Sequence, residues 1–112
     1  MKSATAIFEA LSSPVRRRIL AYLSQTDLSA GQISERFDLS KPTVSRHLSV
    51  LQNAGLITAR RDAQFIFYHL NREHLVSNMY DFLADFCPQS RLLKKESQES
   101  AKAKREKKGD KP

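Results

Sequence analysis

The chain has 112 residues, of which 19 are Lys or Arg and 12 are Asp or Glu, so its formal net charge at pH 7 is +7. This length predicts one small domain, and the excess of positive charge favours a polyanionic partner. A single cysteine excludes a disulfide framework within the chain and suits a reducing compartment. The sequence shows neither a secretory signal nor an apolar stretch long enough to span a bilayer, so we expect a cytoplasmic protein without membrane insertion.

Two short helices are expected at the start of the chain. The apolar face of the first, over residues 4–11, consists of Ala4, Ile7, Phe8 and Leu11. Ser13 and Pro14 suit an N-cap and a first helical position, so they predict the start of the second helix. Arginines at positions 16, 17 and 18 then occupy its opening turns, where cations oppose the helix macrodipole. We therefore expect them to face phosphate or carboxylate groups, and we favour a carboxylate for at least one.

A helix-turn-helix is predicted next. Ser29 and Gln32 have the spacing of a capping box, and the third helix that they start is expected to end near Phe37. After a short turn, Ser40 is the expected N-cap of a fourth helix, and Gly55 supplies the left-handed residue just beyond its end. Two helices joined by a tight turn are the layout of a helix-turn-helix.

The fourth helix, over residues 40–54, has two chemically different faces. Val44, Leu48 and Leu51 recur at helical spacing and are expected to face a core. The other side and the first turn present Lys41, Pro42, Thr43, Ser45, Arg46, His47 and Ser49. Short hydroxyls let a helix approach base edges closely, and arginine can bond guanine bidentately. We interpret this segment as a recognition helix in the DNA major groove, with a capped core helix and an ordinary polar exterior as the alternative.

The periodicity changes from helical to extended after the recognition helix. One strand is predicted over residues 56–61 and a second over residues 65–70, with a turn at residues 62–64 between them. Arg60 and Arg61 lie at the base of this hairpin, and Gln64 lies at its tip. We interpret residues 60–66 as a DNA-binding wing. The alternative is that the arginines keep an exposed edge strand soluble.

The last predicted helix, over residues 72–86, is apolar on more than one narrow stripe. Such a surface in a small domain indicates an interface. We therefore predict a homodimer surface shared with the first helix and formed by Ile7, Phe8, Leu11, Leu75, Met79, Phe82, Leu83 and Phe86. A dimer would present two recognition helices to two half-sites about one turn of DNA apart.

Charge divides the chain into two parts. Residues 89–112 contain nine basic and four acidic residues, a net charge of +5. Residues 1–88 contain ten basic and eight acidic residues, a net charge of +2. The second part is poor in large apolar residues, so we expect a folded domain over 1–88 and a basic, disordered tail over 89–112. The tail either adds salt-sensitive DNA affinity or only keeps the chain soluble.

The sequence resembles the ArsR-type (arsenic-repressor-like) winged-helix repressors over about residues 5–86. The segments with this resemblance are Ser-Ser-Pro-Val-Arg-Arg-Arg-Ile-Leu (12–20), Ser-Ala-Gly-Gln-Ile-Ser-Glu-Arg-Phe (29–37), Ser-Lys-Pro-Thr-Val-Ser-Arg-His-Leu (40–48), Leu-Gln-Asn-Ala-Gly-Leu-Ile (51–57) and Gln-Phe-Ile-Phe-Tyr-His-Leu-Asn (64–71). The last of them looks most like the SdpR-type autorepressor branch.

The resemblance implies a mainly α fold with a small β-hairpin, a winged helix-turn-helix of four helices, two strands and a final helix. It also implies a dimeric repressor that binds a palindromic operator in double-stranded DNA, often its own. The family's base-contacting positions fall on Lys41, Thr43, Ser45 and Arg46, and its wing contacts fall on Arg60, Arg61 and Gln64. One departure is Ala63, where many relatives have glycine; because alanine disfavours positive φ, we expect a different turn shape.

Metal-sensing members of this family need clusters of ligands, and thiophilic metals need several thiolates. Cys87 is the only cysteine, and His74 and Asp81, seven residues apart on the last helix, lack the full pattern of the zinc sensors. We therefore expect no metal and no cofactor, and an inert Cys87 at the helix end. The chain shows no phosphate-binding glycine loop or catalytic triad, so we expect no enzymatic activity.

Three functions remain open. The first is a repressor controlled by its abundance or by a sequestering protein partner. The second is a redox- or metal-responsive sensor repressor, and the third is a module that binds protein rather than DNA.

Overall fold

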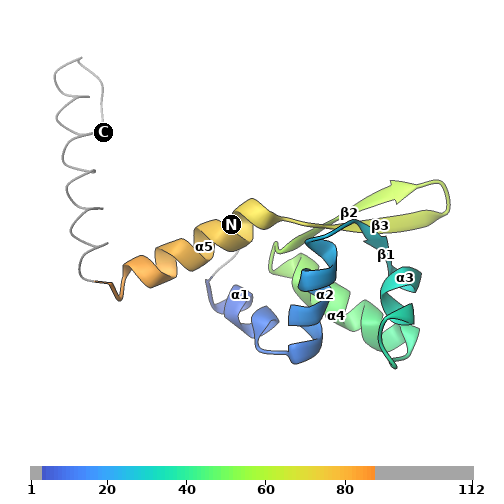
Figure 1. Cartoon of the computed structure of the whole chain (residues 1–112), viewed down its shortest axis with the longest axis horizontal. Helices are drawn as coiled ribbons and strands as arrows, with labels where there is room; N and C mark the ends of the chain where they lie inside the picture. The colour runs from blue at the N-terminus through green and yellow to red at the C-terminus, as the bar shows by residue number, and fades with distance from the viewer. Residues whose placement is uncertain (1–3, 88–112) are drawn as a thin grey trace, which may run out of the picture. The chain divides into compact units, whose positions relative to one another are not determined.

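The computed structural model describes residues 4–87. In chain order its elements are α1 (Ala4–Leu11), α2 (Pro14–Leu23), β1 (Leu28–Ser29), α3 (Ala30–Glu35), α4 (Lys41–Asn53), β2 (Ile57–Asp62), β3 (Phe65–Leu70) and α5 (Arg72–Ala84) (Figure 1). The chain divides into two compact units, residues 1–76 and 77–112, so α5 begins in one and ends in the other. The predicted basic tail lies outside the described residues.

The predicted mainly α fold with a small hairpin is confirmed, with one added strand. β1 pairs with β3 in the register Leu28↔Tyr68, and β3 pairs with β2, so the sheet order is β1-β3-β2 and all pairs are antiparallel. β1 was missed because a two-residue strand is too short to show an alternating pattern. Its effect is to attach the hairpin to the segment between α2 and α3.

Arg16 and Arg17 stabilise the corner between α1 and α2. Arg16 Nε donates to Ala10 O at 2.7 Å and its second terminal nitrogen to Glu9 O at 2.9 Å, while Arg17 donates to Leu11 O at 2.6 Å. These carbonyls belong to the last turn of α1, where the macrodipole is negative, and Glu9 O also accepts from the N–H of Ser12 at 3.2 Å. The expected carboxylate partner was therefore wrong: no carboxylate among residues 4–87 pairs with Arg16, Arg17 or Arg18, and the first two bind neutral carbonyls at the negative end of a helix dipole.

The helix-turn-helix has the predicted caps. Ser29 Oγ accepts from the N–H of Gln32 at 3.2 Å, and Gln32 Oε1 accepts from the N–H of Ser29 at 2.9 Å, which is a complete capping box at the start of α3. α3 ends at Glu35, two residues before the predicted end. The ring of Phe37 then lies under the Arg18 guanidinium, 5.0 Å from its centre.

The caps of α4 also agree with the prediction. Ser40 is extended, and its Oγ accepts from the N–H of Thr43 at 3.4 Å. Gly55 has a φ of 80°, and the N–H of Leu56 donates back to Leu51 O at 3.0 Å. This arrangement is a Schellman motif, and it turns the chain from the helix directly into β2.

The hairpin loop consists of Ala63 and Gln64, because Asp62 pairs with Phe65. Ala63 has a φ of 57°, the left-handed conformation that glycine adopts without cost and that alanine adopts at about 1 kcal/mol. The predicted difference in turn shape stays a prediction, but Ala63 itself has taken the conformation expected of glycine.

One hydrophobic core joins the helices to the base of the hairpin. Its buried side chains between residues 4 and 76 are Ile7, Ala10, Ile19, Leu20, Leu23, Leu28, Ile33, Val44, Leu48, Leu51, Ala54, Leu56, Ile57 and Leu70. Ile7 is 0% exposed in the single chain, so placing it in a dimer surface was wrong. At the start of α5, Asn71 donates to Gly55 O at 3.1 Å and accepts from the N–H of His74, which joins that helix to the end of α4.

Candidate nucleic-acid interface

The recognition helix α4 exposes most of the residues predicted to contact DNA. Lys41, Pro42, Ser45, Arg46 and Ser49 are exposed, and Thr43 and His47 are half-buried. The opposite side of the helix is fully buried through Val44, Leu48 and Leu51. The packing of that side fixes which residues face outward.

The two cations of this face, Lys41 and Arg46, have no carboxylate within ion-pair distance in the described part of the chain. Arg46 therefore retains its five N–H donors for a base edge or a phosphate. Thr43 is less available, because its hydroxyl accepts from Ser40 Oγ at 3.0 Å and contributes to the helix cap.

His47 faces the protein. Its Nδ1 accepts from a terminal nitrogen of Arg16 at 3.1 Å, which places the ring proton on Nε2. Burial, and next the positive charge of Arg16, lower the pKa of His47 below its usual value of 6.5. His47 is therefore neutral at pH 7 and can offer a phosphate only its Nε2–H. Through Arg16, it ties the recognition helix to the end of α1.

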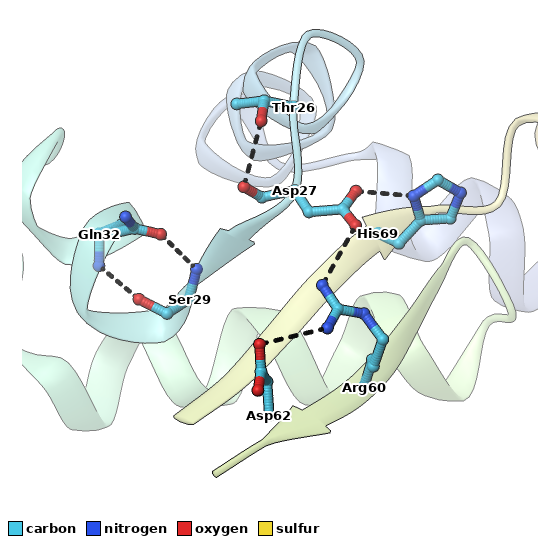
Figure 2. Close-up of polar contacts among 7 residues, drawn as sticks. All are labelled: Thr26, Asp27, Ser29, Gln32, Arg60, Asp62 and His69. Carbon is cyan, nitrogen blue, oxygen red and sulfur yellow. Dashed lines mark hydrogen bonds and ion pairs between the residues drawn. The ribbon is translucent and has the colours of Figure 1, made fainter. Parts of the chain in front are cut away.

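A cluster of charged side chains lies on one face of the wing, and we name Asp27, Arg60, Asp62 and His69 the wing charge cluster (Figure 2). His69 Nδ1 donates to Asp27 Oδ1 at 2.7 Å. The Arg60 guanidinium lies 3.8 Å from Asp27 Oδ2 and 3.8 Å from Asp62 Oδ2, and it is 5.4 Å from the ring centre of Phe67. Arg60 is thus opposed by two carboxylates, a partnership that the sequence did not predict.

Arg61 has different surroundings from its neighbour. It pairs across the hairpin with Ile66, on the opposite face from Arg60 and Phe67. Arg61 and Gln64 are exposed, and no carboxylate among residues 4–87 pairs with Arg61. Of the two wing arginines, Arg61 is therefore the one whose charge is available to DNA.

Comparison with known proteins identifies the family. The sequence profile described as "Bacterial regulatory protein, arsR family" matches residues 13–59. The transcriptional repressor SdpR of Bacillus subtilis is 48% identical over 65 residues, which are 58% of this chain and 72% of that protein. The chain belongs to the arsR family. The prediction of a DNA-binding transcription regulator with a winged helix-turn-helix is thereby confirmed.

Other relatives match over a longer part of the chain. The regulator YgaV of Escherichia coli is 34% identical over 88 residues, which are 78% of this chain and 89% of that protein. Among solved structures, an ArsR-like transcriptional regulator from Rhodococcus sp. RHA1 superposes with a TM-score of 0.70 at 26% identity and covers 85% of this chain and 90% of its own. The similarity therefore extends beyond the helix-turn-helix.

The residues predicted for a dimer surface of this arsR-family regulator fall in both compact units. In residues 4–76, Phe8 is exposed, and Leu11 and Leu75 are half-buried. In residues 77–87, Met79 is half-buried, while Phe82, Leu83 and Phe86 are exposed. Val76 and Tyr80, which belong to the same apolar surface of the last helix, are also more than half exposed. α5 thus exposes large apolar side chains along its length.

The structure offers little to a metal ion. Within residues 4–87, no three His, Cys, Asp or Glu side chains are grouped so that they could hold one, and this includes His74 and Asp81. Cys87, the last described residue, is exposed. No described helix combines the length and apolar character needed to cross a membrane.

Proposed function

We propose that this arsR-family regulator is a homodimeric repressor that binds a palindromic operator in double-stranded DNA, including one in its own promoter. The recognition helix, residues 40–54, would enter the major groove, and the wing, residues 60–66, would contact the adjacent backbone. The observation that supports this most is the exposed face of α4, where Lys41 and Arg46 have no described carboxylate partner and short hydroxyls stand beside them.

Dimerisation is supported by exposed apolar residues of α5 and of the turn that follows it. Val76, Tyr80, Leu83 and Phe86 are 58%, 61%, 61% and 69% exposed, and contact of such side chains with water is costly. A second copy would cover them and bring a second recognition helix to the DNA. A palindromic operator follows, because a two-fold symmetric dimer presents the same surface to each half-site.

We further propose that the protein acts in the cytoplasm, has no enzymatic role and needs no metal effector. Control would come from its abundance or from a protein partner that sequesters it. One relative is named a biofilm growth-associated repressor and another an arsenical resistance operon repressor, whereas HlyU of Vibrio cholerae is named a transcriptional activator. The sign of regulation in this chain therefore needs its own measurement.

A titration of the full chain against its own upstream DNA and a random duplex tests the proposal. It is carried out at several salt concentrations, with and without zinc and a thiol oxidant, and is followed by transcription from the same promoter. Sequence-dependent binding that ignores both reagents and lowers transcription is the expected result. Binding that collapses with zinc or oxidant would indicate a sensor, and the absence of any sequence preference would indicate a protein-binding module.

A further inference from the structure

The wing charge cluster lies on the outer face of the hairpin. Across the two strands, Arg60 pairs with Phe67 and Asp62 pairs with Phe65, whereas the buried pair Ile57↔Leu70 belongs to the other face. Side chains alternate between the faces of a strand, so the cluster points away from the core. Figure 2 shows Arg60 and Asp62 on β2 with Asp27 and His69 beside them.

The backbone holds Asp27 in this position. Asp27 directly precedes β1, and because Leu28 pairs with Tyr68, Asp27 falls next to His69 on β3. The hydrogen bond from His69 occupies Oδ1 at 2.7 Å and turns Oδ2 toward Arg60. The Asp27 side chain is 35% exposed against 57% for Arg60, so the carboxylate is the more firmly placed partner.

Charge on this face opposes DNA. Apart from His69, the cluster contains two carboxylates, Asp27 and Asp62, and one guanidinium. A phosphate approaching Arg60 must therefore displace Asp27 and Asp62 or accept their repulsion. Arg61, on the opposite face, presents no such barrier.

We propose that Asp27 is a positioning residue, which holds Arg60 and so withholds it from the phosphates of DNA. The wing then contributes contacts through Arg61 and Gln64, which require the docking geometry of the correct site. Asp27 in this way limits the part of DNA binding that does not depend on sequence. This inference rests on the proposed approach of the wing to DNA.

The test compares Asp27→Asn, Arg60→Gln and the double variant in the full chain, with Glu9→Gln as the matched control. The amide of Asp27→Asn keeps an oxygen that can accept from His69, so the backbone arrangement is preserved. Glu9→Gln removes one negative charge from α1, away from the wing, and Glu9 has no described ion-pair partner. Each variant is titrated against a random duplex over a series of salt concentrations.

Asp27→Asn is expected to bind random DNA about twofold to fivefold more tightly at low salt, as one weakly paired surface charge is released. Its salt dependence should steepen by about one counterion. In the Arg60→Gln background, the same substitution should have no effect beyond that of Glu9→Gln. Two results would overturn the proposal. The first is that Asp27→Asn raises random-DNA affinity no more than Glu9→Gln does. The second is that Asp27→Asn raises it equally when Arg60 is already replaced, because the loss of one negative charge would then act on DNA directly and not through Arg60.

A second variant protects the test against misfolding. His69→Gln leaves the Asp27 carboxylate in place but removes the hydrogen bond that orients it, so a smaller gain in random-DNA affinity is expected. Unchanged or weaker binding by both folded variants, with unfolding temperatures near that of the wild type, would overturn the proposal. Because the readout is random DNA, a wild-type chain without sequence preference would refute the proposed operator without deciding the role of Asp27.

Discussion

The recognition helix and the wing both present arginines, but only the helix leaves all of its cations unopposed. Lys41 and Arg46 have no carboxylate partner among residues 4–87. In the wing, Arg60 lies between Asp27 and Asp62, while Arg61 is free of both. The number of cations in a segment therefore overstates the charge available to DNA wherever the fold brings carboxylates beside them.

The two regions also differ in what orients them. The recognition helix is fixed by its buried side and by the bond from Arg16 to His47. Only the base of the wing is buried, through Ile57 and Leu70, and its outer half depends on cross-strand pairs. We therefore expect base contacts from the rigid helix and mainly backbone contacts from the wing.

Arg46→Ala should have the largest effect. If Arg46 bonds a base bidentately, its loss should weaken operator binding roughly tenfold to hundredfold and random-duplex binding much less. Arg18→Ala is the matched control, because Arg18 lies on α2 and stacks on Phe37, so it is not part of the exposed face of the recognition helix. Equal losses on the two duplexes in a fluorescence titration would assign Arg46 to the phosphate backbone.

Stability should respond in opposite directions at the two positive-φ positions. Gly55→Ala forces a Cβ into a φ of 80° and is expected to cost about 1–2 kcal/mol at the junction of helix and hairpin. Ala63→Gly relieves the same conformation at the wing tip, and we expect a gain of about 0.5 kcal/mol after the added chain entropy. Urea unfolding measures both; changes of the same sign would contradict the strain assigned to Ala63.

The pH dependence of the free energy of unfolding should reveal the contribution of His47. Its pKa in the folded chain is lowered, first by burial and then by Arg16, whereas the unfolded chain has the usual value near 6.5. As the pH falls below 6.5, the unfolded chain takes up this proton first, so the free energy of unfolding decreases. Between pH 7 and 5.5, the wild type should lose more stability than His47→Gln; parallel losses would exclude His47 as the cause.

Local signals explain why the recognition helix could be predicted so closely. Ser40, Pro42 and Gly55 each act within one turn of the helix end that they define, and Ser29 and Gln32 do the same for α3. The hairpin strands were predicted within one residue, because β-branched and aromatic residues mark β3.

Contacts between distant segments explain what was missed. β1 exists only because β3 lies beside it, and Asp27 reaches Arg60 only through that pairing. The partners of Arg16 and Arg17 are backbone carbonyls, which no side-chain pattern can indicate. Ile7 has the spacing of an apolar stripe, but spacing alone does not say whether the stripe meets its own core or a second chain.

The most direct test of the contrast between opposed and unopposed cations compares the salt dependence of operator binding for Arg60→Gln and Arg61→Gln. A cation that neutralises one phosphate contributes about 0.9 to the slope of log affinity against log salt. We predict that Arg61→Gln lowers the slope by about one and that Arg60→Gln leaves it nearly unchanged. A lower slope for Arg60→Gln alone, or equal decreases for both, would contradict the conclusion that Asp27 and Asp62 keep Arg60 from DNA.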